Sequence, residues 1–363
     1  MRLNKTIQWR NSILGTLMML AVAVIFAFPS NVGAQASPQS SSSLSFIPRK
    51  NYVIEPGKSV KDTLLIRNPD ASLPLHLSLK VVDFTYADDS GNAKFLLQDG
   101  LPPTVWSLKS YLTAPQNVTI PAGSSKTIDI SVAIPAGLGA GSYYSAIVYS
   151  SGSGQGGNVS LSASGVTLVF AAIPGKVTEN LKLTHLGAYD SSATKPGYTV
   201  ATVNEPLHIG YTLLNGGNVT EAPVGNIKLK YMFGGEQTIE NINPNQSVAL
   251  INQARTFTAC IKSKQANITI DGGSSTVSNC AAPGLLPGMY TVSLDAFYGQ
   301  NGNPTQEITG TAVFWYLPVW FTVTVVALLL IVAFLIWRFA VRRRHSPLEP
   351  KQNNNRTSND ALQ

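Results

Sequence analysis

Cys260 and Cys280 carry the most specific chemical signal in the sequence. They are the only cysteines in 363 residues. In an oxidising compartment such a pair joins as a disulfide, and closing a loop of this length would contribute about 3 kcal/mol by the chain-entropy model. The segment between them is mostly polar, so we expect a staple that holds an exposed excursion. That excursion could also serve as a binding loop.

The remaining residue types that catalyse reactions do not form a recognisable site. The four histidines are His76, His185, His208 and His345, and none has a second histidine or a glutamate at zinc-binding spacing. A nucleophile elbow with plausible partners, a Walker loop and a dinucleotide fingerprint are also missing from the sequence. We therefore predict a protein that is not an enzyme and that has no cofactor, no metal site and no small-molecule substrate.

An acidic cluster offers one further possibility. Asp83, Asp88, Asp89 and Asn92 lie close together in the sequence and could suggest a calcium site. Their spacing does not match that of an EF-hand loop. Short polar residues around a glycine are typical of a hairpin turn, which is the structure we expect here.

The elements that would position these residues are strands. Apolar and polar residues alternate with a period of two, which buries one face of a strand and exposes the other. Glycine- and proline-containing turns separate the alternating segments, and many short strands with such turns favour antiparallel sandwiches. The clearest alternating segments are 75–81, 128–134, 207–213, 227–233 and 292–294.

A weak internal repeat divides the chain in two. Segment 139–149 and segment 286–298 each begin with a glycine turn and continue as an aromatic-rich strand. The first of these is apolar on both faces from Tyr143 to Tyr149, which suggests a central strand. We predict an all-β fold: two tandem immunoglobulin-like β-sandwiches plus one C-terminal transmembrane helix. Residues 46–177 would form the first sandwich and residues 178–313 the second.

The N-terminal segment resembles a signal peptide. Arg2, Lys5 and Arg10 precede an apolar stretch at 13–28, and small residues end at Ala34. This order of charge, apolar core and small residues predicts cleavage after residue 34, with an uncleaved anchor as the alternative. A flexible, serine-rich leader at 35–45 would follow.

A second apolar segment predicts a membrane anchor. No charged residue lies between Glu307 and Arg338, and about 20 apolar residues span a bilayer core. We expect a transmembrane helix at 314–338 and a basic cytoplasmic tail at 339–363, oriented by the positive-inside rule as a single-pass type I protein of the cell membrane. The residues expected to flank the membrane are Trp315, Trp320, Trp337, Arg338, Arg342, Arg343 and Arg344.

The formal charge of +7 does not indicate a nucleic-acid partner. Outside the predicted signal peptide and the segment from Arg338 onward, 17 basic and 17 acidic residues remain. The mature ectodomain is therefore formally neutral and lacks the basic surface that a phosphate backbone requires. The excess positive charge reflects membrane topology.

Several motifs resemble a known family. They are "YVIEPGKSVKDTLLIRN" (52–68), "FTYADDSGNAKF" (84–95), "VTIPAGSSKTIDISVAIP" (118–135) and "IPGKV" (173–177). With them, the chain resembles the WxL-interacting surface proteins of Gram-positive bacteria. The first domain is similar to that family's peptidoglycan-binding-type domain and the second to its host-binding-type domain. The resemblance implies binding to cell-wall polymer (peptidoglycan), to other surface proteins or to host matrix.

Two functions follow as expectations. The first is a membrane-anchored cell-surface binding or scaffold protein for cell-wall polymer or surface proteins, with the segments 150–158 and 260–280 as candidate binding loops. The alternative is a membrane-tethered, chaperone-like assembly factor for surface proteins. It would hold a client at an exposed strand edge near Tyr143 to Tyr149.

Overall fold

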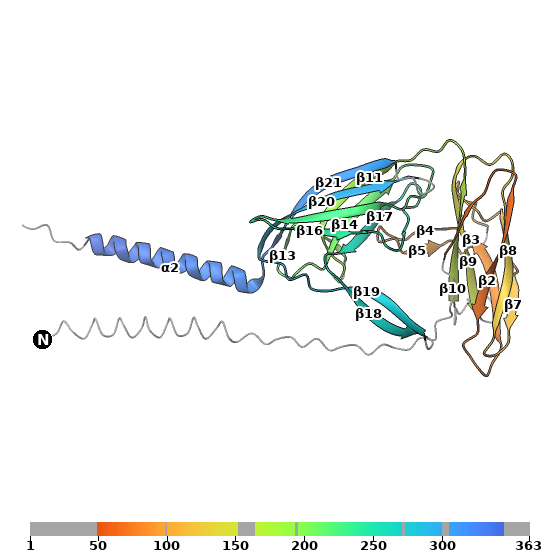
Figure 1. The fold of residues 1–363 in the computed structure, drawn as a ribbon, viewed down its shortest axis with the longest axis horizontal. Coiled ribbons are helices and arrows are strands. Elements are labelled where there is room, and N and C mark those ends of the chain that lie inside the picture. The colour runs from red at the N-terminus through yellow and green to blue at the C-terminus, as the bar shows by residue number, and fades with distance from the viewer. Residues whose placement is uncertain are drawn as a thin grey trace, which may run out of the picture. The chain divides into compact units, whose positions relative to one another are not determined.

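The computed structural model describes residues 49–98, 100–151, 164–192, 195–270, 273–299 and 305–344. The predicted signal peptide, the leader and the tail beyond Arg344 lie outside these residues. Within them the chain is almost entirely β-structure, as predicted, with one long helix near the C-terminus (Figure 1).

The first domain is a two-layer sandwich. One sheet has the strand order β1-β10-β9-β3-β7 and the other the order β2-β8-β6, and a two-stranded hairpin, β4-β5, extends from them. Alternating residues of β2, β3 and β8 are buried between the sheets, so the period-two segments at 75–81 and 128–134 are confirmed as strands. The strands are β1 (Arg49–Val53), β2 (Ser59–Arg67), β3 (Leu75–Val82), β4 (Phe84–Tyr86), β5 (Ala93–Phe95), β6 (Leu112–Thr113), β7 (Asn117–Ile120), β8 (Ser125–Ala133), β9 (Gly141–Ser151) and β10 (Ser164–Ile173).

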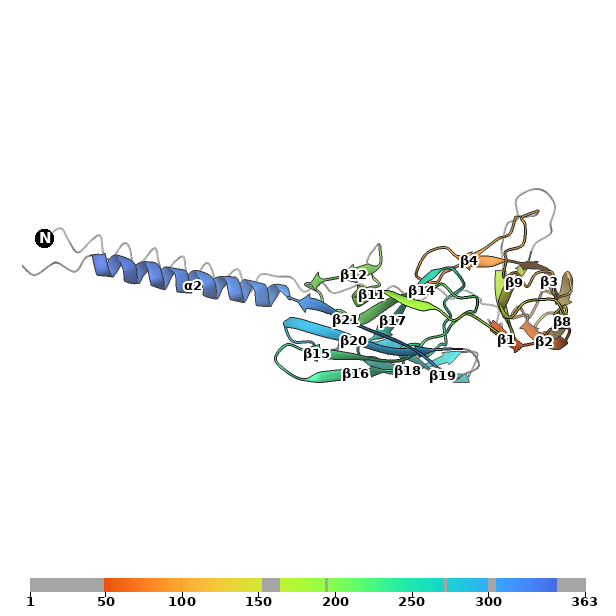
Figure 2. The ribbon, with the colours of Figure 1, turned by 90° about the horizontal axis from the view of Figure 1, so that it is seen from above.

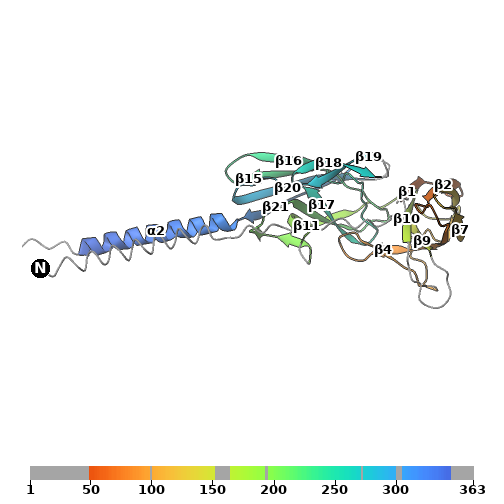
Figure 3. The same ribbon diagram turned by 90° about the horizontal axis from the view of Figure 1, so that it is seen from below.

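The second domain is a second sandwich. Its sheets have the orders β12-β11-β14-β17 and β13-β21-β20-β15-β16, and the hairpin β18-β19 forms a separate two-stranded sheet. Figure 3 shows the neighbouring strands β16, β15, β20 and β21 of the larger sheet. The strands are β11 (Leu181–Asp190), β12 (Gly197–Thr199), β13 (Ala201–Thr202), β14 (His208–Asn215), β15 (Val224–Tyr231), β16 (Glu236–Glu240), β17 (Ala254–Cys260), β18 (Ser263–Ile270), β19 (Gly273–Cys280), β20 (Gly288–Tyr298) and β21 (Gln306–Tyr316).

Each sandwich has its own apolar core, and a third cluster joins the two domains. Among the described residues, no strand of 49–173 pairs with a strand of 181–316. The third cluster combines Phe84, Tyr144 and Phe170 of the first domain with Val248 and Leu250 of the second. The contacts between the domains are therefore made by side chains and loops.

The predicted strand at 227–233 ends early. β15 stops at Tyr231, and Met232 to Gly235 form the turn into β16. Gly234 and Gly235 have φ values of 102° and 88°, a conformation that favours glycine and that ends the pleat there. Phe233, which the alternation placed on the buried face, is consequently exposed.

The C-terminal helix begins later than predicted. β21 continues to Tyr316, so α2 (Val319–Arg344) starts at residue 319 rather than 314 and continues past 338. The reason is that residues 312–316 still pair with β20 as part of β21. Figure 2 shows β21 leading into α2. Residues 319–341 form a stretch of 23 residues that is long and apolar enough to cross a membrane.

Candidate functional site

One face of the larger first-domain sheet is covered by the second domain. β9 is buried along nearly its whole length, and it pairs with β10 on one side and β3 on the other. One face of β9 contributes Ile147 and Tyr149 to the sandwich core, while Tyr144 and Ala146 on the other face pack in the interdomain cluster. The apolar pattern of β9 thus has two causes, and its prediction as a central strand is confirmed. The predicted exposed edge at Tyr143 to Tyr149 is wrong, because both edges of β9 are paired.

Polar contacts hold the same junction from its other side. The β4-β5 hairpin reaches the second domain, where Arg255 donates from Nη1 to the Tyr86 hydroxyl at 2.7 Å and to the Val248 carbonyl at 2.7 Å. The backbone N–H of Tyr86 donates to Gln253 Oε1 at 2.8 Å. At the start of β9, the Ser142 N–H donates to the Asn218 carbonyl at 3.0 Å. Apolar packing and these hydrogen bonds together restrain the angle between the sandwiches.

A groove of about 410 Å³ opens at the junction beside β1. On the first-domain side it is lined by β1 and by the end of β10, and on the second-domain side by the segments 220–224 and 246–248. Only two of the residues that line it carry a carboxyl or guanidinium group, Glu221 and Arg49. The electrostatic character of the groove depends on these two side chains.

Arg49 presents a cation to the groove. Its Nη1 donates to the Gln246 carbonyl at 2.6 Å, its Nε donates to Asn51 Oδ1 at 2.8 Å, and its guanidinium carbon lies 5.1 Å from the centre of the Phe170 ring. Burial lowers the pKa of Arg49 below its ordinary value, although a guanidinium keeps its charge at any physiological pH. Among the described residues Arg49 has no salt-bridge partner; the one salt bridge there joins Lys50 to Asp62.

Glu221 contributes little negative charge. Its side chain is 1% exposed, and its Oε1 has no hydrogen-bond partner in the described part of the chain. Burial, reinforced by the charge of Glu179, raises the pKa of Glu221 to about 8. At neutral pH this carboxyl group is therefore mostly protonated. Arg49 is then the main formal charge of the groove, which favours an anionic group as its occupant.

The groove runs beside an unpaired strand edge. β1 is the end strand of its sheet and pairs in parallel with β10. Ile54 donates from its N–H to the Ala172 carbonyl at 3.0 Å, so alternate residues of β1 face β10. The N–H and C=O groups of Arg49, Asn51 and Val53 consequently point away from β10, toward the edge where no described strand pairs. Such an edge can accept an added strand.

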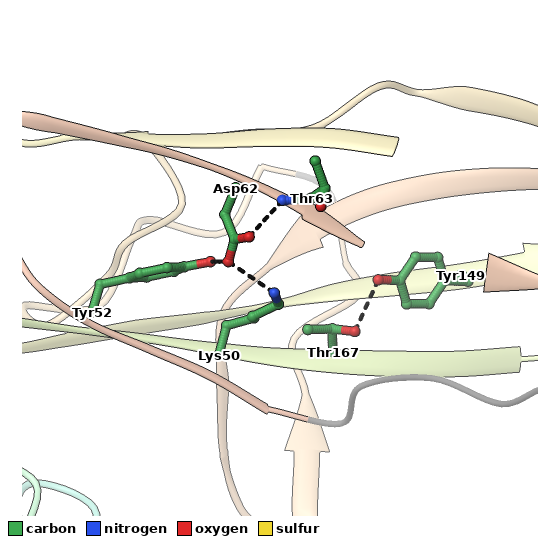
Figure 4. A network of polar contacts seen from close by, with 6 residues as sticks. All are labelled: Lys50, Tyr52, Asp62, Thr63, Tyr149 and Thr167. Atoms are coloured by element: carbon green, nitrogen blue, oxygen red, sulfur yellow. Dashed lines mark hydrogen bonds and ion pairs between the residues drawn. The ribbon is translucent and has the colours of Figure 1, made fainter. Parts of the chain in front are cut away.

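A carboxylate of the facing sheet holds β1 in place (Figure 4). Asp62 of β2 accepts hydrogen bonds at Oδ2 from Lys50 Nζ at 2.8 Å and from the Tyr52 hydroxyl at 2.7 Å. The Thr63 N–H donates to Asp62 Oδ1 at 2.7 Å. The hydrogen bonds from Lys50 and then Tyr52 lower the pKa of Asp62 to about 2. Close by in the same view, the Tyr149 hydroxyl donates to Thr167 Oγ1 at 2.9 Å.

The opposite edge of the same sheet is protected. β7 is the end strand there, and Lys126 donates from Nζ to the Thr119 carbonyl of β7 at 3.1 Å. A lysine that occupies edge carbonyls blocks the addition of another strand. Of the two edges of this sheet, β1 is the one that combines open backbone groups with a groove.

The structure confirms the disulfide between Cys260 and Cys280, whose Cα atoms lie 5.2 Å apart. The excursion that it closes is the hairpin β18-β19 rather than an irregular loop. The other predicted binding loop, at 150–158, lies outside the described residues from 152 onward.

The acidic segment 88–92 forms the turn between β4 and β5, as predicted, and Asp88 accepts a hydrogen bond from the Ser90 N–H at 2.9 Å. Asp83 is not in that turn. It is buried and accepts hydrogen bonds from Ser107 and Ser145.

His208 lies unexpectedly close to the disulfide. Its Nε2 is 3.1 Å from the Sγ of Cys280, and burial lowers its pKa. The three side chains His208, Cys260 and Cys280 have donor atoms within 4.8 Å of one another. Because the two sulfur atoms are joined to each other, they do not act as thiolate ligands, and the cluster is not a metal site in this oxidised state.

The predicted membrane-flanking residues fall on two elements. Trp315 lies in β21, where it pairs with Met289, so it belongs to the second sandwich and not to the helix. Trp320, Trp337 and Arg338 lie in α2, and both tryptophans are exposed along it. Arg342, Arg343 and Arg344 form the last described turn of α2.

Sequence reasoning did not identify Arg49 or Glu221. Neither belongs to a motif, and the signal that singles them out is the parallel pairing of β1 with β10 together with packing between domains. The one sequence clue was indirect: Glu221 lies next to Thr220 and Ala222 in a segment with few charges, where a lone acid is a candidate for burial.

Comparisons with known proteins leave the family open. No family model matches the chain, and no curated protein matches it. Among solved structures, a chaperone–tip adhesin complex of CFA/I fimbriae matches with 11% identity and a TM-score of 0.32, covering 77% of this chain and 100% of that one. The class 5 fimbriae chaperone CfaA matches with 12% identity and a TM-score of 0.31, covering 74% and 98%.

A third match is the Escherichia coli chaperone DraB, with 12% identity, a TM-score of 0.30, and coverage of 65% and 95%. At TM-scores near 0.3 these likenesses carry no functional argument. The immunoglobulin-like fold follows from the strand pairing of the chain itself, and the resemblance to WxL-interacting surface proteins stays a prediction.

Proposed function

We propose that this chain is a membrane-anchored extracytoplasmic protein that binds surface proteins by taking an extended segment onto the free edge of β1. The observation that carries the proposal is the outward row of backbone groups on Arg49, Asn51 and Val53 beside a groove whose main charge is the Arg49 guanidinium. Added strands bind through main-chain hydrogen bonds, and adjacent pockets give specificity. An acidic side chain or a terminal carboxylate of the segment would bind next to Arg49.

The anchoring part of the proposal rests on α2. Residues 319–341 are long and apolar enough to span a bilayer, and arginines follow them. By the positive-inside rule those arginines would remain in the cytoplasm, and both sandwiches would then lie outside. The disulfide between Cys260 and Cys280 agrees with an oxidising location for the second sandwich.

This function corresponds to the chaperone-like alternative more closely than to a wall-polymer scaffold, with the binding edge moved from β9 to β1. An extended polypeptide can use the whole row of β1 backbone groups, because its N–H and C=O groups alternate with the same spacing. A polysaccharide lacks that repeating pattern of donors and acceptors. Cell-wall polymer is the second candidate partner, and the experiment below distinguishes it from an extended polypeptide.

The test uses the full-length protein in lipid nanodiscs. An array of ten-residue peptides from the surface proteins of the source organism, each with either a free carboxylate or an amide at its C-terminus, is probed with the native protein and with Asn51→Pro, Asn51→Ala and Arg49→Gln. Asn51→Pro removes the outward N–H, while Asn51→Ala loses the same side chain and keeps that N–H. We expect Asn51→Pro to bind about tenfold more weakly than Asn51→Ala, the effect of one or two lost hydrogen bonds.

Arg49→Gln should weaken the binding of peptides that carry a free C-terminal carboxylate or an acidic side chain, and should leave the binding of amidated peptides without acidic side chains unchanged. Equal binding by the proline and alanine variants would refute strand addition at β1. Saturable binding to purified peptidoglycan, with no peptide bound, would favour the wall scaffold instead. Thermal unfolding of each variant identifies any loss that comes from misfolding.

A further inference from the structure

The second sandwich leads into α2 almost without a linker. β21 ends at Tyr316 and α2 begins at Val319, so only Leu317 and Pro318 lie between them. The backbone N–H of Leu317 donates to the Thr202 carbonyl at 2.8 Å, which ties this short connection to β13. Two residues reach at most about 7 Å when fully extended. A membrane entered by α2 must therefore lie directly against this end of the sandwich.

Strand pairing defines which residues share that end. Tyr316 pairs with Gly288 at the start of β20, and Tyr290 pairs with Tyr231 at the end of β15. The turn that contains Phe233 and the segment that contains Leu286 are consequently neighbours of the helix entrance. On the other side of β21, Val200 accepts a hydrogen bond at its carbonyl from the Trp315 N–H at 2.8 Å.

Large apolar side chains are exposed at this end. Phe233 is 78% exposed, Val200 75% and Leu286 60%, and Val203, Met232 and Trp315 are also exposed. Phe233 is held in an edge-to-face contact with Tyr231, with ring centroids 5.5 Å apart. Single exposed apolar residues are ordinary, but a group of six at one end of a domain indicates a surface that something covers.

We propose that this apolar end, formed by Val200, Val203, Met232, Phe233, Leu286 and Trp315, is a membrane-contact surface that inserts into the interface of the bilayer crossed by α2. The inference rests on the proposal that α2 spans a membrane. Aromatic and apolar side chains at the headgroup level lower the free energy of such a contact. A protein partner is disfavoured as the occupant because a packed layer of protein is about 10 Å thick, more than the two-residue connection allows.

The consequence would be a fixed orientation of the two sandwiches relative to the bilayer. A single helix with a flexible connection would let the ectodomain tumble. The apolar end, the Leu317 hydrogen bond and the short connection would instead hold the second sandwich upright on the bilayer. The interdomain cluster and the Arg255 contacts would pass that restraint to the first domain and so orient the β1 edge relative to the membrane.

The test uses the full-length protein reconstituted in vesicles of phosphatidylcholine and phosphatidylglycerol. Variants with one added cysteine, Phe233→Cys, Leu286→Cys, Val105→Cys and Val332→Cys, are labelled with bimane at the added thiol, while Cys260 and Cys280 remain joined in their disulfide. Quenching is measured with two nitroxide lipids, one labelled high on the acyl chain and one labelled near its end. Val105 is a matched control, since it is 90% exposed and belongs to the first domain. Val332 lies within α2 and reports insertion of the helix.

We expect at least twofold quenching by the shallow nitroxide at positions 233 and 286, comparable quenching by the deep nitroxide at 332, and none by either lipid at 105. Quenching at 332 with none at 233 and 286 would overturn the membrane-contact surface and leave the anchor intact. Absence of quenching at 332 would overturn the anchor and, with it, this inference. As a second measurement, a Phe233→Ser, Leu286→Ser double substitution should reduce the quenching of a label at Val200→Cys.

Discussion

Arg255 in the second sandwich donates a hydrogen bond to the hydroxyl of Tyr86 in the first, and its guanidinium carbon lies 5.1 Å from the centre of the same ring. The two residues are 169 positions apart in the chain. Tyr86 also donates from its hydroxyl to the Val248 carbonyl, and burial raises its pKa. A single tyrosine thus connects the β4-β5 hairpin to the opposite domain through a donor, an acceptor and a ring face.

Replacing Tyr86 by Phe should loosen the domain junction. The change keeps the ring contact with Arg255 and removes the hydroxyl, which leaves the Val248 carbonyl with one donor fewer. We expect the free energy of unfolding to fall by about 1–2 kcal/mol, the cost of a buried hydrogen bond in a network. Urea unfolding measures the loss, and hydrogen exchange should show faster exchange in 84–95 and 248–257.

The matched control is Tyr111→Phe, which lies in the first domain away from Arg255. Similar exchange at 248–257 in the two variants would contradict a junction role for Tyr86.

The raised pKa of Glu221 predicts that the free energy of unfolding depends on pH. Its pKa is about 8 in the folded chain and near 4.5 when unfolded, so the folded state binds the proton more tightly. The contribution of Glu221 to stability should therefore be complete below about pH 4.5 and be lost as the pH rises through 8, by roughly 2–4 kcal/mol as an order of magnitude. Glu221→Gln removes the titrating group and should flatten this part of the curve.

The measurement is urea unfolding of the native protein and of Glu221→Gln between pH 5 and pH 9. Glu179→Gln serves as a comparison, because it removes a neighbouring charge while leaving Glu221 able to titrate. Parallel curves for the native protein and Glu221→Gln would show that another group causes the dependence.

The lowered pKa of Asp62 predicts a contribution to the free energy of unfolding with the opposite pH dependence. Its pKa is lowered to about 2 by hydrogen bonds from Lys50 and Tyr52, so its stabilisation is complete above about pH 4 and is lost as the pH falls through 2. The carboxylate is partly solvated, so Asp62→Asn should cost no more than about 1 kcal/mol. The larger effect should be local: amide exchange in 49–54 should accelerate while that in β9 does not. Uniform acceleration across the sheet would contradict a specific role in holding β1.

We expect the disulfide to stabilise mainly the β18-β19 hairpin that it closes. Replacing Cys260 and Cys280 by Ala should lower the free energy of unfolding by about 3 kcal/mol, since the bridge closes a loop of 20 residues. Loss of the disulfide releases the base of the β18-β19 hairpin, whereas the residues of the second-domain core lie mainly on other strands. Limited proteolysis should therefore cleave 261–280 first. Simultaneous cleavage throughout the second sandwich would show that the bridge supports the whole domain.

Much of the architecture was predictable from local patterns. Period-two alternation located β3, β8, β14 and β20, because each buries one face and the pleat repeats every two residues. The pairing of two lone cysteines and the apolar helix followed from composition. Element ends were less accurate: the exposed position of Phe233 depends on two glycines with positive φ, and the start of α2 depends on the pairing of Trp315 with Met289.

The candidate site was not predictable in the same way. Arg49 is one basic residue among 26, and nothing near it in the sequence marks it. Its importance comes from the parallel pairing of Arg49 with Leu168 and from the contact with Gln246, both far away in the chain. The same holds for Glu221, whose pKa depends on burial by the segments packed around it.

The sequence by itself determined the strands, the staple and the apolar helix, because alternation, cysteine chemistry and hydropathy act over a few residues or depend only on composition. The tertiary structure alone decided which strand edges are open, which charges are buried and which apolar residues gather beside the helix. β9 shows the difference: its residues are apolar on both faces in any fold, but only the positions of β10, β3 and the second domain decide that both its edges and both its faces are covered. Edge exposure and burial depend on contacts between residues distant in the chain, and a local pattern holds no information about those contacts.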